Sequence, residues 1–415
     1  MRKRKFDFNF SLVLASQIIS LFGGNIHRFA LILFLVDFTQ SPSLLGVITA
    51  ISQLPVIFFA PLGGVLADRF NKKVLIVILD SMKALVAFTV FVLFITDTIA
   101  VWNVAILMTL SVTIMTFFSP VLTAAVPRIV DKEVLVEANG AMQTINGFAF
   151  LLGAASGGIL MAAMGAQNLI LICGIFFLAS VFIDLFIKIP FEKREQTTGF
   201  LKTMVSDMKE SWGFIRNENP TILKMALLFS VVVVLFQPIV VVGVPYVVRL
   251  LMGASEDLVG IAKALSGFGL IFGGLFAGKI KQWLHIGSFW KLMLLFGVSG
   301  PIFALAVHPA IIGGRLWLPF GLFSFTLLIV MSTATIVNIM VNVIIQKETP
   351  PNLIGKVGSL FGMVANIASP FGQVLFGVII GATTGYLHWV FIGVGLIMLA
   401  LAVFSKMVFK KEEEA

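Results

Sequence analysis

Charged side chains inside or beside long apolar runs are the residues of this chain best placed to do chemistry, because a charge in hydrocarbon is costly without a partner. Asp80 and Lys83 stand three residues apart, so on a helix they share one face and can neutralise each other. A carboxyl group that loses its water shell can also bind and release a proton. Alternatively, the pair is purely structural, and Asp184 is an interfacial group. The candidates for proton coupling or charge relay are Asp80, Lys83, Asp184 and Asp37.

Two further cations, Arg28 and Lys263, also fall within apolar runs. Arg28 follows two glycines and Asn25, which could loosen a helix there. It could line a cavity for an anionic group or pair with a proton-carrying acid. It could instead extend toward the outer interface or pair with Asp37. Lys263 has the same two interpretations.

Polar side chains at a few other apolar positions suggest the wall of a cavity. Gln237 follows Phe236, and Asn338 and Asn342 are spaced to share a helix face. A mostly apolar cavity with few hydrogen-bonding groups suits lipophilic small molecules, although the same groups could instead bond between helices. The candidate cavity residues are Asn25, Arg28, Phe236, Gln237, Lys263, Asn338 and Asn342.

The composition indicates a membrane protein. Of 415 residues, 59% are hydrophobic and 12% are charged, and the mean hydropathy is +1.06. Soluble domains carry about 25% charged residues. The net charge of +9 therefore reflects membrane topology rather than nucleic-acid binding.

Twelve apolar runs reach the roughly 20 residues that a spanning helix needs. They cover residues 10–36, 43–67, 74–96, 100–127, 138–164, 168–190, 221–248, 257–283, 288–308, 316–344, 357–383 and 386–409. With a cytoplasmic N-terminus, only Arg249 and Arg315 among the Lys and Arg residues fall in outer loops. This asymmetry places both termini in the cytoplasm.

The longest polar stretch divides the chain into two halves of six runs. We predict an N-terminal six-helix bundle over 1–190, a cytoplasmic linker over 191–220 and a C-terminal bundle over 221–415. Apolar residues recur at helical spacing within 200–212, so this part of the linker is predicted to be an amphipathic helix on the inner membrane surface, or else an ordinary linker helix. The predicted fold class is an all-α polytopic membrane protein.

The two halves also resemble each other in sequence. Gly153 and Gly158 match Gly372 and Gly377, and each pair is 219 residues apart. "GGVLADRFN" from residue 63 is echoed by "GGLFAGKIK" from residue 273. Such repeats predict two pseudo-symmetric six-helix bundles related by an axis along the membrane normal, with a substrate site between them, as in transporters.

The stretch from Gly64 to Lys73 resembles the signature G-x-x-A-D-R-x-G-R-[KR] of the major facilitator superfamily, with Asn71 in place of Gly and Lys72 in place of Arg. "SLFGGNIHRFAL", "VPRIVDKEVLVEANG" and "GKVGSLFG" are similar to its macrolide-efflux and siderophore-exporter branch. We expect the signature to lie on the cytoplasmic loop between the second and third spans.

The resemblance implies a cytoplasmic gate, in which Asp68 and Arg69 hold the two halves together on the inner side while the cavity faces outward. Asp68 would act on the N-terminus of the span that begins near Lys356. Alternatively, Lys72 and Lys73 serve only to orient the chain. The gate candidates are Gly64, Asp68, Arg69, Lys72, Lys73 and Arg128, and a charge relay would link Asp80 to Arg69 and Arg128.

The fifth run resembles the antiporter signature G-P-x-x-G-G of the same superfamily, with Ala154 in place of Pro. Its glycines, Gly153, Gly157 and Gly158, favour an exporter, although ordinary close packing of helices also explains them. The chain lacks the acid that many proton-coupled members carry in the first span. The proton-binding residue is therefore not assigned by the resemblance.

These patterns predict a twelve-helix secondary transporter, monomeric and located in a bacterial plasma membrane, that exports amphipathic or lipophilic small molecules against proton entry. A siderophore exporter or lipid flippase of the same fold is the alternative, and a membrane receptor or scaffold that does not transport is the third. No phosphate-binding loop of an ATPase and no cluster of Cys and His occurs in the sequence, so we expect neither an enzyme nor a cofactor.

Overall fold

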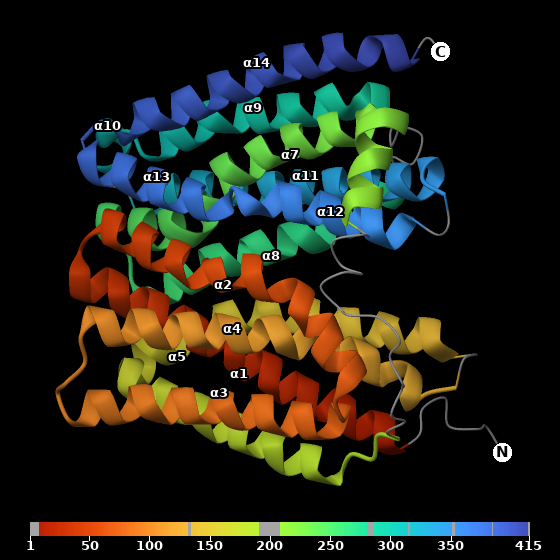
Figure 1. Ribbon diagram of the computed structural model, residues 1–415. Coiled ribbons are helices and arrows are strands. Elements are labelled where there is room, and N and C mark those ends of the chain that lie inside the picture. The colour runs from red at the N-terminus through yellow and green to blue at the C-terminus, as the bar shows by residue number, and fades with distance from the viewer. Residues whose placement is uncertain are drawn as a thin grey trace. The chain divides into compact units, whose positions relative to one another are not determined.

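The computed structural model describes residues 8–131, 134–190, 208–279, 286–313, 316–350, 353–383 and 385–413, and these residues form helices joined by short connections (Figure 1). In lipid, a helix satisfies all of its backbone hydrogen bonds internally, so long apolar runs fold this way. The first half contains α1 (Phe8–Thr39), α2 (Pro42–Arg69), α3 (Lys72–Ile95), α4 (Val101–Ala125) and α5 (Leu135–Phe186). The second contains α7 (Pro220–Pro238), α8 (Glu256–Lys279), α9 (Phe289–Ala306), α10 (Pro309–Ile312), α11 (Trp317–Glu348), α12 (Ile354–Ile367), α13 (Ser369–Ala382) and α14 (Leu387–Glu413).

Helix α5 contains two predicted spans joined at Gly165. Its apolar part, Gly140–Phe186, has 47 residues, which is about 70 Å of helix, or twice a hydrocarbon core of about 30 Å. Gly165 interrupts it with φ 77° and ψ 167°, a conformation that only glycine adopts readily. Contacts along α1 show the reversal, because residues 153 and 157 meet α1 in the same chain direction, whereas residues 176 and 180 meet it in the opposite direction.

The structure therefore agrees with twelve crossings, since eleven apolar segments of the described residues are long enough to cross and one of them turns back on itself. We call the parts of α5 before and after Gly165 its first and second limbs. Another predicted span, 357–383, consists of α12 and α13, which are separated at Ala368.

The contacts within the chain form two units. The first contains residues 1–39 and 51–200, and the second contains residues 40–50 and 201–415. Helix α2 is continuous through both sets, so a domain boundary between 190 and 220 stays a prediction. In the first unit α1 and α3 pack against α5, and α3 packs against α4. In the second unit α9 lies beside α14, α8 beside α11, and α7 against α12 and α13 (Figure 1).

Glycines at matching positions bring matching helices together in the two halves. A β-carbon on Gly63 of α2 would come within 2.6 Å of Pro120 in α4. A β-carbon on Gly273 of α8 would come within 2.8 Å of Thr335 in α11. The second and fourth crossings of each half thus approach closely at a small residue, as the sequence repeat predicts.

The connection between α2 and α3 is shorter than the sequence indicates. Helix α2 continues to Arg69, so only Phe70 and Asn71 separate the two helices. The Asn71 side chain accepts hydrogen bonds from the backbone N–H groups of Lys73 and Val74, at 3.0 and 3.4 Å, and so caps α3. The predicted span 43–67 is therefore two residues too short, because Asp68 and Arg69 continue the helix up to the connection that holds the capping asparagine.

The linker is described only from residue 208. Most of the predicted amphipathic helix, residues 200–207, lies outside the described residues, and residues 208–213 are helical and lead into a π-helical turn (Phe214–Glu218). Within the second unit, Glu210 of this segment forms an ion pair with Lys356 at the start of α12, with 2.7 Å between Oε2 and Nζ.

Candidate functional site

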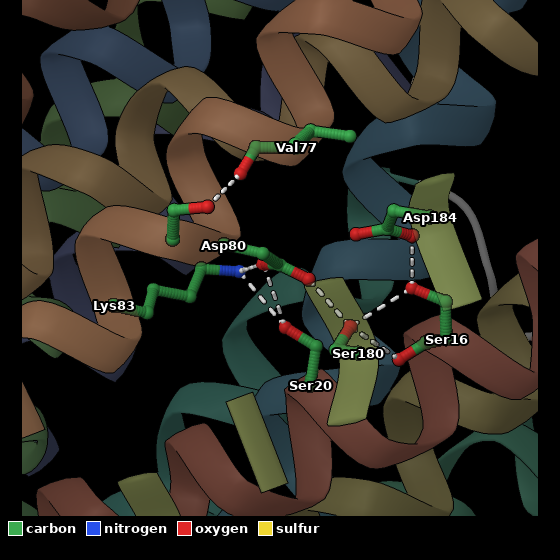
Figure 2. A network of polar contacts seen from close by, with 8 residues as sticks. Ser16, Ser20, Val77, Asp80, Lys83, Ser180 and Asp184 are labelled. Carbon is green, nitrogen blue, oxygen red and sulfur yellow. Dashed lines mark hydrogen bonds and ion pairs between the residues drawn. The ribbon is translucent and has the colours of Figure 1, made fainter. Parts of the chain in front are cut away.

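Three helices of the first unit bring six polar side chains together in its interior (Figure 2). Each helix contributes two residues three or four positions apart, a spacing that places both side chains on one face. Helix α1 contributes Ser16 and Ser20, α3 contributes Asp80 and Lys83, and the second limb of α5 contributes Ser180 and Asp184. We call these six residues the buried cluster.

The ion pair at the centre of the buried cluster joins the Nζ atom of Lys83 to Oδ1 of Asp80 at 2.6 Å. Ser20 bridges the two groups, because its hydroxyl donates to Asp80 Oδ1 at 3.0 Å and accepts from Lys83 Nζ at 3.0 Å. The ammonium group of Lys83 also lies 3.2 Å from the centre of the Phe118 ring, a favourable cation–π position. Asp80 is 0% exposed and Lys83 is 5% exposed, so the ion pair is shielded from solvent.

Two serine hydroxyl groups connect Asp80 to the second carboxyl group of the cluster, which belongs to Asp184. Ser180 donates to Oδ2 of Asp80 at 2.5 Å, and its hydroxyl oxygen lies 2.9 Å from that of Ser16. Ser16 is in turn hydrogen-bonded to Oδ1 of Asp184. Asp184 is 1% exposed, and among the described residues its Oδ2 atom has no hydrogen-bond partner.

The charges of the cluster do not balance when both acids are ionised. Two carboxylates and one ammonium group leave one net negative charge in a buried, low-dielectric setting, where an uncompensated charge is strongly unfavourable. One bound proton removes that charge. The arrangement can therefore take up and release one proton, which is the chemistry expected for a coupling site.

A further cation lies just outside the cluster. Lys73, in the first turn of α3, donates from Nζ to the backbone oxygen of Leu185 at 2.7 Å, next to Asp184. The contact joins the start of α3 to the last turn of α5. Lys72 beside it is buried.

The structure brings together three of the four proton-coupling candidates. The Asp80–Lys83 pair is present as the spacing predicts. Asp184 is buried in the cluster, near the end of α5. Asp37 stands 17 residues after Ser20 on the same helix, or about 25 Å along its axis.

The three serines of the cluster were not predicted from the sequence. The signal was the i, i+4 spacing of Ser16 and Ser20 within an apolar run, and of Ser180 and Asp184 within another. A serine in an apolar helix commonly bonds to its own backbone, as Ser299 does to Phe296 O at 2.7 Å. The spacing alone therefore does not show that these hydroxyl groups face a neighbouring helix.

The structure leaves the cytoplasmic gate a prediction. The side chains of Asp68 and Arg69, and the surroundings of Gly64, lie outside the described part of the structure. Arg128 is half-buried in a 3₁₀ turn (Val126–Arg128) that follows α4. The charge relay from Asp80 to Arg69 and Arg128 also stays a prediction. In the buried cluster, Asp80 forms hydrogen bonds with Lys83, Ser20 and Ser180.

The candidate cavity residues of the first unit lie on α1. Arg28 is exposed, and among the described residues it has no ion-pair partner. Asn25 is half-buried and donates to the backbone oxygen of Leu21 at 2.8 Å. Pairing of Arg28 with Asp37 is not observed.

The cavity candidates of the second unit differ in their surroundings. Lys263 is half-buried on α8. Asn338 and Asn342 are exposed on α11, and the side-chain amide of Asn342 donates to the side-chain oxygen of Asn338 at 3.0 Å. This hydrogen bond lies within one helix rather than between two.

Phe236 and Gln237 are neighbours in the sequence but have different surroundings. Phe236 is 2% exposed and its ring centre lies 4.9 Å from that of Phe296. It belongs to the helix packing of the second unit, so its prediction as a cavity residue is wrong, because its helix face meets α9. Gln237 is half-buried and accepts a hydrogen bond from Ser369, which also accepts from Gln373 at 3.3 Å.

The glycines of the antiporter-like signature are buried where α5 meets α1. A β-carbon on Gly153 would come within 2.6 Å of the Asn25 side chain, and one on Gly157 would come within 3.0 Å of the Phe29 ring. Gly158 is also buried. The first limb of α5 can thus approach α1 closely, which is the packing role that small residues serve.

Sequence comparison gives this architecture a family. The family model of the Major Facilitator Superfamily matches residues 13–373. Macrolide efflux protein A of Streptococcus pyogenes is 22% identical over 399 residues, which cover 96% of this chain and 95% of that protein. An uncharacterized MFS-type transporter of Bacillus subtilis, YfiS, is 24% identical over 393 residues, covering 94% of this chain and 91% of that protein.

Solved structures share the fold at low sequence identity. A bacterial homologue of the human lysosomal transporter Spinster, in an inward-facing and unoccupied conformation, has a TM-score of 0.73 and 13% identity over 98% of each chain. The nucleoside transporter NupG has a TM-score of 0.71 and 14% identity over 97% of this chain and 100% of its own. Twelve crossings in two repeated halves, together with a family match over most of the sequence, establish that this chain belongs to the Major Facilitator Superfamily and is a multi-pass membrane transporter rather than an enzyme.

Proposed function

We propose that this transporter exports amphipathic or lipophilic small molecules and that proton entry through the buried cluster drives the export. The observation that carries the proposal is the imbalance of charge in the cluster, where two buried carboxyl groups share one buried ammonium group. Such a site changes its net charge when it binds one proton, and the change can favour one conformation of the transporter over another.

The substrate class rests on the relatives. The curated relatives that span nearly the whole chain include macrolide efflux protein A. Macrolides are amphipathic and bulky, and a largely apolar cavity with few polar groups suits them. Arg28 of α1 is an exposed polar side chain that could orient such a molecule.

The direction of transport rests on the macrolide efflux relatives and on the antiporter-like glycines Gly153, Gly157 and Gly158. The asymmetry of Lys and Arg supports an orientation with both termini in the cytoplasm of a bacterial cell. Export against proton entry then requires the substrate site to open alternately to the two sides. We assign the gate on the inner side to Asp68 and Arg69, as the superfamily signature implies.

The experiment measures macrolide uptake into everted membrane vesicles with and without an imposed pH gradient. Wild-type vesicles should accumulate the macrolide at least about 10-fold more with the gradient, equal to roughly 1.4 kcal/mol of coupled driving force. Asp184→Asn and Asp80→Asn should abolish the gradient-dependent part. Asp97→Asn is the matched control, since Asp97 lies in a turn at φ 52°, a conformation that asparagine tolerates, outside the cluster.

Two outcomes would contradict the proposed function. Accumulation that is the same with and without the gradient in wild-type vesicles would show that protons do not drive transport. Full gradient dependence in Asp184→Asn would show that the buried cluster is not the coupling site. Membrane levels of each variant are measured in parallel, so that poor insertion is not read as lost coupling.

A further inference from the structure

We infer that Ser16 and Ser180 form a hydroxyl relay between Asp184 and Asp80, and that this relay is complete only when one of the two carboxyl groups carries a proton. The inference deepens the proposed function. Only the use of the proton to drive transport rests on that proposal. Its geometry stands on the buried cluster alone (Figure 2).

Three oxygen–oxygen contacts follow one another across the cluster. Oδ1 of Asp184 is hydrogen-bonded to the Ser16 hydroxyl. The Ser16 hydroxyl lies 2.9 Å from the Ser180 hydroxyl, and the Ser180 hydroxyl lies 2.5 Å from Oδ2 of Asp80. Each contact is within hydrogen-bond distance, so each needs one hydrogen atom between its two oxygens.

The serines supply too few hydrogen atoms for these contacts. A hydroxyl group donates one hydrogen, and an ionised carboxylate donates none. With both acids ionised, Ser16 donates to Asp184 and Ser180 donates to Asp80, which leaves the contact between the two hydroxyls without a hydrogen. A proton on one carboxyl group supplies the missing third hydrogen and completes the row.

The same proton corrects the charge. With one carboxyl protonated, the remaining carboxylate is balanced by Lys83, which lies 2.6 Å from Asp80. The cluster is then neutral in a setting where a net charge is costly. Hydrogen counting and charge counting therefore require the same single proton.

The relay also allows the proton to move without water. If Asp184 is protonated, its hydrogen passes to Ser16 as the hydrogen of Ser16 passes to Ser180 and that of Ser180 passes to Asp80. One proton leaves Asp184, one arrives at Asp80, and each serine keeps one hydrogen. All four residues of the row are 3% exposed or less, so no bulk solvent is needed for the step.

The ends of the relay are not equivalent. Asp184 stands two residues before the end of α5, and its Oδ2 atom has no hydrogen-bond partner among the described residues. Asp80 is held by Lys83 and Ser20 and has both oxygens in hydrogen bonds. These contacts favour the ionised form of Asp80, so we assign both the entry of the proton and its resting place to Asp184.

The neighbouring elements add one more charge. Helix α4 presents the Phe118 ring to Lys83, and α1 presents hydroxyl groups. The first turn of α3 brings Lys73 to the backbone oxygen of Leu185. Lys73 is only half-buried and lies outside the buried cluster, whose charged groups are Asp80, Lys83 and Asp184.

The test is infrared difference spectroscopy of the purified full-length protein in lipid vesicles, in light and heavy water. A protonated carboxyl group gives a carbonyl stretching band that an ionised one lacks and that shifts on exchange into heavy water. The wild-type protein should show this band at neutral pH, and Asp184→Asn should remove it. Ser16→Ala and Ser180→Ala should each shift the band to higher frequency, because the protonated carboxyl loses the hydrogen bonds of the relay.

Controls separate the relay from general disturbance of the helices. Ser299→Ala removes a hydroxyl that is equally buried but bonded to its own helix, and it should leave the band in place. Ser16→Thr and Ser180→Thr keep a hydroxyl at each position and should restore the wild-type frequency. Absence of a protonated carboxyl band in the wild-type protein at neutral pH would overturn the inference. A band that neither serine-to-alanine variant moves would also overturn it.

This readout needs no substrate and no gradient. A band that responds as expected in a protein whose transport ignores the pH gradient would support the relay and reject the proposed coupling. Gradient-driven transport in a protein without the band would reject the relay and leave the proposed coupling intact.

Discussion

The first, third and sixth crossings pack together in both halves of the molecule, but they enclose different side chains. In the first half, α1, α3 and the second limb of α5 surround the Asp80–Lys83 ion pair and Asp184. In the second half, α7, α9 and α14 meet through aromatic rings. Phe236 lies 4.9 Å from Phe296, and Phe289 lies 5.7 Å from Phe409, measured between ring centres.

The comparison shows that this architecture does not need buried charge. The second half achieves the same arrangement with phenylalanines and with glycines such as Gly300, which lies against Gly395 of α14. Well-packed apolar residues are often as stabilising as a buried ion pair, or more so. The charges of the first half are therefore better explained by function than by folding.

The largest effect is expected when one charge of the ion pair is removed. Lys83→Met should lower the free energy of unfolding by roughly 3–5 kcal/mol, because it leaves two buried carboxyl groups without a cation. Adding Asp80→Asn to that variant should recover most of the loss, since the double variant resembles the neutral core of the second half. Chemical unfolding in detergent micelles measures both changes. A Lys83→Met protein as stable as wild type would mean that the pair is not coupled as the geometry indicates.

An intermediate effect is expected from the aromatic core of the second half. Phe303 is fully buried, with its ring centre 5.1 Å from that of Phe323 and 5.2 Å from that of Phe391. Phe303→Ala should destabilise the protein by about 3 kcal/mol through the cavity it leaves. Because this core contains no charge, the protein that does fold should keep its dependence on the pH gradient. The same unfolding assay, with vesicle transport alongside, tests this, and a loss of pH dependence would show that coupling extends beyond the first half.

A smaller effect, local to helix packing, is expected at the glycines. A β-carbon on Gly300 would lie 2.5 Å from the Cα atom of Gly395, so Gly300→Ala should separate α9 from α14 and cost about 1–3 kcal/mol. Gly24→Ala is the control, because its β-carbon would meet nothing within 4 Å. Thermal unfolding of the two proteins should differ, and equal melting temperatures would show that the α9–α14 contact is looser than the structure has it.

The sequence predicted the helices better than it predicted their faces. All twelve spans were expected, and the repeat of glycines at Gly63 and Gly273 correctly indicated matching helix contacts. In lipid, however, both the buried and the lipid-facing sides of a helix are apolar, so periodicity does not show which side meets a neighbour. This is why Phe236 was predicted to line a cavity and why the serines of the buried cluster were overlooked.

The charged residues of the candidate site could be predicted from the sequence, but the contacts between helices that bring them together could not. The i, i+3 spacing of Asp80 and Lys83 determines that they can pair on one helix. That Asp184, 101 residues after Lys83, joins them depends on the reversal of α5 at Gly165 and on the packing of α1. These are tertiary contacts, which no local pattern of the sequence encodes.

The most direct test of the comparison is to give the first half the neutral core of the second. The triple variant Asp80→Asn, Lys83→Met, Asp184→Asn should insert, fold and bind its substrate, yet its transport in everted vesicles should no longer respond to a pH gradient. Gradient-driven transport at the wild-type rate in this variant would contradict the assignment of proton coupling to the buried cluster.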